Sequence, residues 1–182
     1  VNEYGMLGQN NKTNYSSPKQ VPGSTWSKVS GMNNSVIAVK TDGTAWSWGS
    51  NSYGEIGIND RTSYSSPKQI PGTNWKRVIN GNNESAGVKT DGTLWTWGRN
   101  NNGQLGLNNR TNYSSPVQVP GTTTWDRVWT SSSGSMKATR TDGTLWGWGS
   151  GTTGGTGPGN KSSPTQIPGT WGRQGQAGGI KL

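Results

Sequence analysis

Basic and aromatic side chains recur at fixed intervals in this sequence, and their types are suited to binding. Basic residues occupy one repeated position at Lys12, Arg61, Arg110 and Lys161, and tyrosines occupy another at Tyr15, Tyr64 and Tyr113. Lys and Arg attract phosphate and carboxylate groups, and a phenol ring can stack on a sugar ring while nearby Asn amides reach hydroxyls. These seven residues are therefore the candidate binding residues, for an anionic or a glycan surface.

A structural interpretation competes with each set. Cations that occur once per repeat are expected to be spread around a ring of repeats. Binding along the backbone of a nucleic-acid duplex instead calls for a continuous stripe of cations, so these residues also fit an ordinary solvated surface. Two further basic positions repeat in the same way: Lys28, Arg77, Arg127 and Arg173, and Lys40, Lys89 and Arg140. Each tyrosine directly precedes Ser-Ser-Pro, where its ring is also expected to pack under the connecting loop.

Catalytic and metal-binding residues are scarce. The chain has no His and no Cys, which removes the commonest general base, the commonest neutral metal ligand and thiolate chemistry. Three of its eight acidic residues are turn residues, Asp42, Asp91 and Asp142, and the other five form no facing pair of the kind that a glycosidase needs. The sequence therefore predicts no catalytic residue, no metal site and no cofactor.

Composition favours a binding protein with an unusual core. The net charge of +9 indicates an anionic partner, such as nucleic acid, an acidic cell-surface polymer or an acidic protein. Leu, Ile and Val number only 23 of 182 residues, which would fit disorder, but 11 tryptophans can bury enough apolar surface to replace an aliphatic core. No apolar run reaches the ~18 residues of a membrane span, so no span is expected.

The chain is built from a repeat of about 49–51 residues. The phrase KTDGTLWTWG at Lys89–Gly98 has counterparts at Lys40–Gly49 and Arg140–Gly149, and a proline phrase and a glycine phrase recur at similar steps. We divide the chain into repeat units of residues 1–49, 50–98, 99–149 and 150–182, the last of them incomplete, and treat the whole as a single propeller segment.

Each unit predicts four short strands. In the first unit these are Lys19–Val21, Trp26–Val29, Val36–Lys40 and Thr44–Trp48, with the last two joined by a two-residue Asp-Gly hairpin turn. Four strands per unit at this period are typical of a β-propeller blade.

Two positions in the third predicted strand carry further expectations. The small residues Ala38, Gly87 and Ala138 indicate close approach of a strand or an indole ring. Lys137 replaces Ile37 and Ala86, so we expect either a wetter strand or a slipped register there.

The combination of phrases resembles the regulator of chromosome condensation repeat family, in particular its bacterial and viral relatives. The resemblance rests on SPVQVPG, the following W-x-x-V, TDGTLWxWG and the NGQLGL phrase at Asn102–Leu107, and it covers essentially the whole chain. It implies a β-propeller, seven-bladed in the well-known members. Many members have a His at the start of the third strand, where this chain has Ser35, Glu84 and Ser135. No segment resembles the loop that eukaryotic members use for nucleotide exchange, so the resemblance does not extend to that activity.

We therefore expect an all-β protein with about three full blades of four antiparallel strands plus part of a fourth. Such a segment belongs to a longer protein, assembles with a second copy to complete a ring, or forms an open stack. The function that we expect is a non-enzymatic structural or binding scaffold that contacts a protein or glycan surface. A secreted, cell-surface or virion location, such as a tail or appendage, follows from family analogy. The alternative is a nucleic-acid-associated or nucleotide-exchange-type propeller.

Overall fold

The computed structural model describes residues 1–151, 159–169 and 171. Within these ranges the chain forms twelve strands and no helix, so the all-β prediction is confirmed. None of the described segments is a helix with the length and apolarity needed to cross a membrane.

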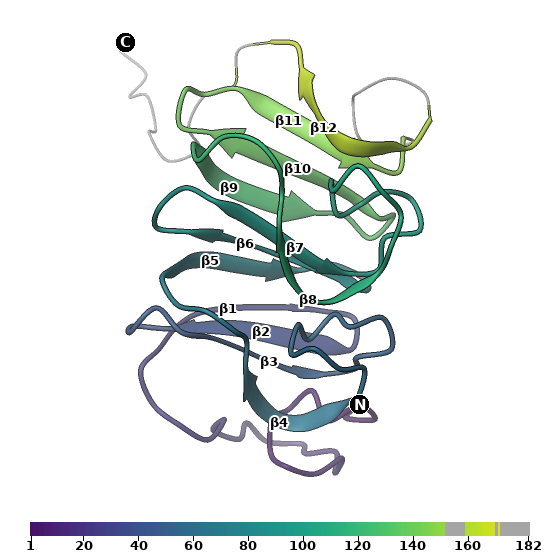
Figure 1. Ribbon diagram of the computed structural model, residues 1–182. Helices are drawn as coiled ribbons and strands as arrows, with labels where there is room; N and C mark the ends of the chain where they lie inside the picture. Colours follow the sequence, from purple (N-terminus) through teal and green to yellow (C-terminus); the bar gives the residue numbers. More distant parts are fainter. Residues whose placement is uncertain (152–158, 170, 172–182) are drawn as a thin grey trace, which may run out of the picture.

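The strands form three sheets, each of four antiparallel strands (Figure 1). The first sheet contains β1 (Trp26–Met32), β2 (Ser35–Lys40), β3 (Ala45–Gly49) and β4 (Tyr64–Gln69) in that order. The second contains β5 (Trp75–Asn80), β6 (Glu84–Lys89), β7 (Leu94–Gly98) and β8 (Tyr113–Gln118). The third contains β9 (Trp125–Thr130), β10 (Ser135–Arg140), β11 (Leu145–Gly149) and β12 (Lys161–Ile167). Three blades are thus complete, and residues 1–25, at the start of the first unit, form loops and turns before β1.

Each sheet takes its outer strand from the next repeat unit. The proline phrase forms β4, β8 and β12, and each of these strands pairs with the Trp-x-Trp-Gly strand that precedes it in the chain. The predicted strand at Lys19–Val21 is wrong, because this segment has no regular secondary structure. A strand requires a hydrogen-bonded neighbour, and the part of the chain that the structure describes contains no Trp-x-Trp-Gly strand before Lys19.

The Asp-Gly hairpins form, but with a longer turn than expected. In the first sheet the amide of Lys40 donates to the carbonyl of Thr44, and the amide of Gly43 donates to the carbonyl of Lys40. The loop therefore contains three residues, Thr41 to Gly43, of which Gly43 has positive φ. This is the type I turn followed by a left-handed glycine, so the prediction of a two-residue Asp-Gly turn is wrong.

Indole rings form a layer on the same face of every sheet. Trp75 packs edge-on against Trp95 and Trp97, with ring centroids 6.5 and 5.9 Å apart, and the equivalent rings of the other two sheets are 6.0 to 6.3 Å apart. The second indole of each Trp-x-Trp pair also donates from Nε1 to a carbonyl in the glycine phrase of its own repeat unit, as Trp97 does to Glu55 at 3.0 Å. Each glycine phrase is thus fastened to the sheet that follows it.

The apolar core lies between adjacent sheets rather than inside any one of them. One cluster joins Ile37, Val39, Ala45 and Ile70 to Trp75, Val78 and Trp97 of the second sheet. A second, larger cluster joins the second sheet to the third. Burial of these faces stabilises the stack, because each sheet alone would expose its indoles to water.

The small residue at position 87 is explained by an indole. A Cβ atom on Gly87 would lie 2.7 Å from Trp75, so close approach of a ring is confirmed there. Lys137 is half-buried and pairs with Gly147 in the same register that joins Ile37 to Ser47. The register has not slipped, and the Lys side chain occupies the outward face of the third sheet.

Candidate binding surface

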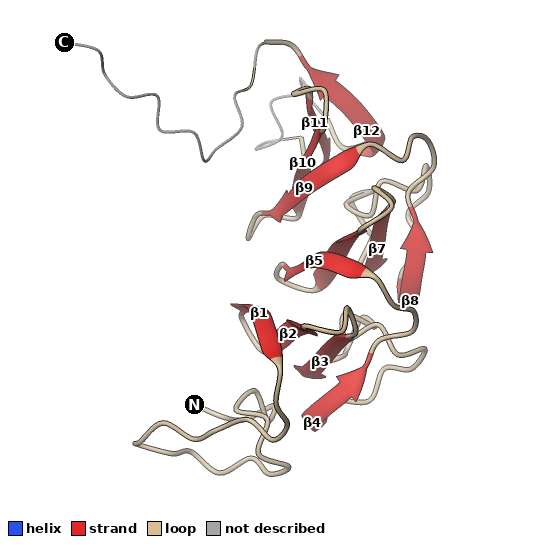
Figure 2. Ribbon diagram, turned by 90° about the vertical axis from the view of Figure 1, so that its left-hand side faces the viewer, coloured by secondary structure: helices blue, strands red, loops and turns tan. Residues whose placement is uncertain are grey.

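The three inner strands bring basic residues together along one side of the stack. Figure 2 shows β1, β5 and β9 on one side and β4, β8 and β12 on the opposite side. Strand β5 contacts both β1 and β9. The repeated position occupied by Lys28, Arg77 and Arg127 lies on these strands, so its cations converge along this side.

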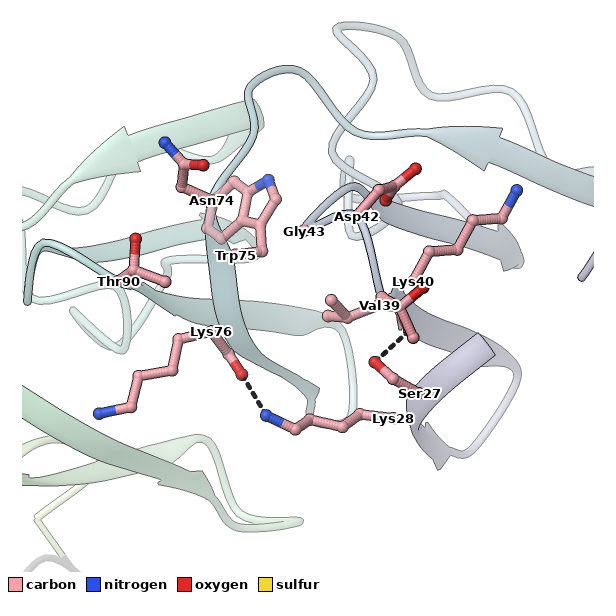
Figure 3. Close-up of a pocket in the computed structure, with 11 residues that line it drawn as sticks. Ser27, Lys28, Val39, Lys40, Asp42, Gly43, Asn74, Trp75, Lys76 and Thr90 are labelled. Atoms are coloured by element: carbon pink, nitrogen blue, oxygen red, sulfur yellow. Dashed lines mark hydrogen bonds between the residues drawn. The ribbon is translucent and has the colours of Figure 1, made fainter. Parts of the chain in front are cut away.

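A pocket of about 540 Å³ lies between the first two sheets at this inner side (Figure 3). Its lining includes Lys28 of β1, Lys40 of β2, Lys76 of β5, and Asp42 with Gly43 from the first hairpin turn. The Nζ atom of Lys28 donates to the main-chain carbonyl of Lys76 at 2.6 Å, which links the two sheets across the pocket. With three Lys and one Asp in its lining, the pocket is suited to an anionic group.

The charged groups of the pocket differ in how freely they can bind. Lys40 lies over two indoles, with Nζ 4.9 Å from the Trp26 centroid and 4.4 Å from the Trp46 centroid, so it has a structural cation–π role. The backbone amide and hydroxyl of Thr44 both donate to Asp42, and these bonds lower the pKa of its carboxyl group. Lys28, which is exposed, is the cation best placed to meet a ligand.

The interface between the second and third sheets has different charges at the place equivalent to this pocket. Lys76 Nζ forms an ion pair with Asp126 Oδ1 of β9 at 2.7 Å. Arg127 Nε also lies 3.8 Å from Asp126 Oδ2. Asp126 therefore partly neutralises the cations between the second and third sheets. The Lys76 ammonium group belongs to this interface, because at the first interface Lys28 contacts only the main-chain carbonyl of Lys76.

The basic candidates predicted from the sequence do not form one site. Lys12, Arg61 and Arg110 are exposed in the loops that precede the outer-strand segment of each repeat, and Lys161 is half-buried at the start of β12. The structure places them on different repeats. Arg173, from the second basic set, lies outside the described residues.

The tyrosine candidates are held by their own loops. Tyr64 begins β4 and donates from its hydroxyl to Asp60 Oδ2 at 3.0 Å, whereas the hydroxyls of Tyr15 and Tyr113 accept from Asn11 and Asn109. Tyr113 also packs against the cluster between the second and third sheets. Tyr64 and Tyr113 are half-buried, and Tyr15 is 37% exposed.

Sequence analysis missed Lys76 as a site residue. Its position holds Ser27 in the first repeat and Asp126 in the third, so a search for repeated charges passes over it. The signal that could have identified Lys76 is that its position, on an inner strand, holds a different residue type in each repeat. Among the described residues, no group of three or more Asp or Glu side chains is placed to hold a metal ion.

Comparison with solved structures supports a propeller fold. The crystal structure of human WBSCR16 superposes with a TM-score of 0.80 at 21% identity, covering 92% of this chain and 46% of that one. Prp20p from Saccharomyces cerevisiae, which binds Gsp1p and histones, gives a TM-score of 0.81 at 20% identity, covering 93% of this chain and 45% of that one. Yeast Prp20 bound to Kap60 gives a TM-score of 0.75 at 21% identity, covering 84% of this chain and 39% of that one. This chain thus spans less than half the length of each of these proteins.

Sequence comparison identifies the repeat itself. A search of curated proteins gave no significant match. The family model described as the regulator of chromosome condensation (RCC1) repeat matches residues 42–85 and 91–136, which contain the Trp-x-Trp-Gly strands β3 and β7 and the inner strands β5 and β9. With its three blades and these matched repeats, the chain belongs to the regulator of chromosome condensation repeat family.

Proposed function

We propose that this chain is a non-enzymatic binding scaffold that holds an anionic protein surface against its inner strands. The observation that carries the proposal is the pocket between the first two sheets, where the exposed Lys28 has no acidic residue at the β1 position that corresponds to Asp126. The solved relatives support a protein partner, because Prp20 binds Gsp1p and histones and was solved bound to Kap60.

The repeat architecture supports a scaffold role. The indole layer and the cation–π contacts use most of the repeated residues to hold the sheets together. Variable residues on loops and inner strands can then change without loss of the stack. On the resemblance of its repeats to bacterial and viral members, we further propose a secreted, cell-surface or virion setting. In that setting Tyr15, Tyr64 and Tyr113, with Lys12, Arg61, Arg110 and Lys161, would add contacts to a protein or glycan along the outer loops.

A charge-reversal experiment tests the pocket. The double variant Lys28→Glu/Lys76→Glu should weaken binding of a glutamate-rich peptide at least tenfold, which corresponds to about 1.4 kcal/mol. The matched control is Lys19→Glu/Lys68→Glu, which changes the net charge equally at exposed residues that are not among the proposed contacts. Equal losses in both variants would show that net charge alone attracts the peptide, and would contradict the proposal.

Nucleic acid is the second candidate partner, because the net charge is +9 and the inner strands carry converging cations. A duplex contacts several cations at once, so its affinity should fall steeply as salt concentration rises. Fluorescence anisotropy with a labelled DNA duplex and with the glutamate-rich peptide, over one salt series, separates the two. Tighter duplex binding with a steep salt slope would favour the nucleic-acid function, including a nucleotide-exchange-type or chromatin-associated role.

A further inference from the structure

A second pocket lies on the face of the third sheet that points away from the second sheet. Its volume is about 180 Å³, and it is lined by Trp129, Thr130, Ser131, Ser135 and Lys137. Val128 of β9 packs against the second sheet, and the next residue, Trp129, points to the opposite face of the strand. The pocket shares no lining residue with the pocket at Lys28, so this site is independent of the proposed function.

The pocket is built on a row of residues that crosses three strands. Lys137 of β10 pairs with Trp129 of β9 and with Gly147 of β11, so the three residues share one face of the sheet. The equivalent rows of the other sheets hold Ser30, Ile37 and Ser47 in the first and Ile79, Ala86 and Thr96 in the second. Of the three sheets, the third alone therefore combines an indole ring with an ammonium group in this row.

In the first two sheets this row is covered by the sheet that follows. Ile37 and Ala86 are both 0% exposed and belong to the apolar clusters between the sheets. In the third sheet Trp129 is 39% exposed and Lys137 is half-buried. Lys137 is poorly suited to the same packing, because burial of an ammonium group without an acidic partner is costly. The row of the third sheet therefore suits a polar ligand better than another apolar sheet face.

Among the residues that the structure describes, the ammonium group of Lys137 has no anionic partner. It takes part in neither of the ion pairs found there, and it lies over no described indole ring of the kind that holds Lys40 and Lys89. The sequence from residue 143 to residue 182 contains no Asp or Glu, so the C-terminal part of this chain supplies no carboxylate. Lys137 therefore favours an anionic acceptor on a ligand.

The other side chains of the pocket indicate what carries this anion. The exposed indole of Trp129 offers a flat apolar surface on which the C–H face of a sugar ring can stack. Thr130 donates its hydroxyl hydrogen to the Asn80 carbonyl at 3.2 Å, so its oxygen can accept a hydrogen bond from a sugar hydroxyl. An acidic peptide side chain would use the ammonium group but has no flat apolar face for the indole.

The size of the pocket fits one sugar ring. A volume of about 180 Å³ corresponds to roughly six water molecules at ~30 Å³ each. We propose that the pocket binds an acidic sugar of the uronic acid type, with its ring on Trp129 and its carboxylate group at Lys137.

Titration with methyl β-glucuronide, followed by NMR, tests the site. One sugar ring held by an indole and an ammonium group should bind with a Kd in the millimolar range. Methyl β-glucoside, which has a hydroxymethyl group in place of the carboxylate, should bind at least tenfold more weakly. The variants Trp129→Ile and Lys137→Ala introduce the residues of the second sheet, so they should keep the fold, and each should weaken glucuronide binding at least tenfold.

Lys28→Ala is the matched control, because it removes one positive charge at the other pocket and should leave glucuronide binding unchanged. Lys137→Ala should in turn keep the affinity for the glutamate-rich peptide, which separates this site from the proposed function. If the wild type does not bind the glucuronide, if either pocket variant binds it as tightly as the wild type, or if the glucoside binds equally well, the inference is wrong. Displacement of the glucuronide by the glutamate-rich peptide would assign the pocket to peptide carboxylates and would also overturn it.

Discussion

The two interfaces between sheets share one apolar layer and differ in their polar contacts. Trp97 at the first interface and Trp148 at the second both lie fully within the core, and each donates to a glycine-phrase carbonyl. At the first interface Asn80 donates to Ser35, and Lys28 Nζ donates to the main-chain carbonyl of Lys76 beside an open pocket. At the second, Thr130 stands at the position equivalent to Asn80 and donates to the Asn80 carbonyl, the Oε1 atom of Glu84 lacks a donor, and Asp126 pairs with Lys76.

This comparison separates stability from binding. The repeated indoles give both interfaces similar packing. Positions whose residue type differs between repeats give the first interface a cationic pocket, and they give the second interface an ion pair and a buried carboxyl group. Binding properties therefore depend on departures from the repeat.

The largest expected effect tests the shared apolar layer. Trp97→Ala and Trp148→Ala should each lower the free energy of unfolding by about 3–5 kcal/mol, because each removes a buried indole and leaves a cavity. Trp129→Ala is the control, since that ring is 39% exposed and its loss should cost less than about 1 kcal/mol. Chemical denaturation followed by far-ultraviolet circular dichroism measures all three. A loss at only one of the two interfaces would contradict their equivalence.

The next effect concerns the buried carboxyl group at the second interface. The pKa of Glu84 is about 7 in the folded chain against an ordinary value of 4.5, so the folded state holds its proton more tightly than the unfolded state. Stability should be greatest below pH 4.5 and should fall by about 3 kcal/mol as pH rises through 7, at ~1.4 kcal/mol per pKa unit. Glu84→Gln should remove most of this decline, which urea titrations at several pH values between 4 and 8 would reveal. An unchanged decline in Glu84→Gln would assign it to another group.

The smallest effect concerns the ion pair. Asp126→Asn should lower the free energy of unfolding by only ~0.2–1 kcal/mol, because Lys76 is 45% exposed and such pairs contribute little in water. The same change leaves Lys76 without its facing charge and should make the second interface resemble the first. Binding of the glutamate-rich peptide should therefore strengthen, by up to about tenfold at low salt. Weaker binding would mean that Asp126 orients Lys76 for the ligand.

Much of the fold was predictable from local pattern. Trp-x-Trp spacing places both indoles on one face of a strand, and the Asp-Gly pairs mark hairpins, so three of the four strands in the first unit were found. The failed strand, Lys19–Val21, carries the same proline phrase as β4. It differs in lacking a neighbouring strand among the described residues, and that neighbour is a property of the tertiary structure.

The sequence by itself determined the period, the all-β class and the indole layer, because these depend on residues close together in the chain and repeated in every unit. Only the tertiary structure decided that each sheet takes its outer strand from the next unit, that Lys28 contacts the main-chain carbonyl of Lys76, and that Trp129 and Lys137 border one pocket. The first two relations join residues of successive repeats. They arise only when one sheet stacks on another, and a pattern within a single repeat does not contain them.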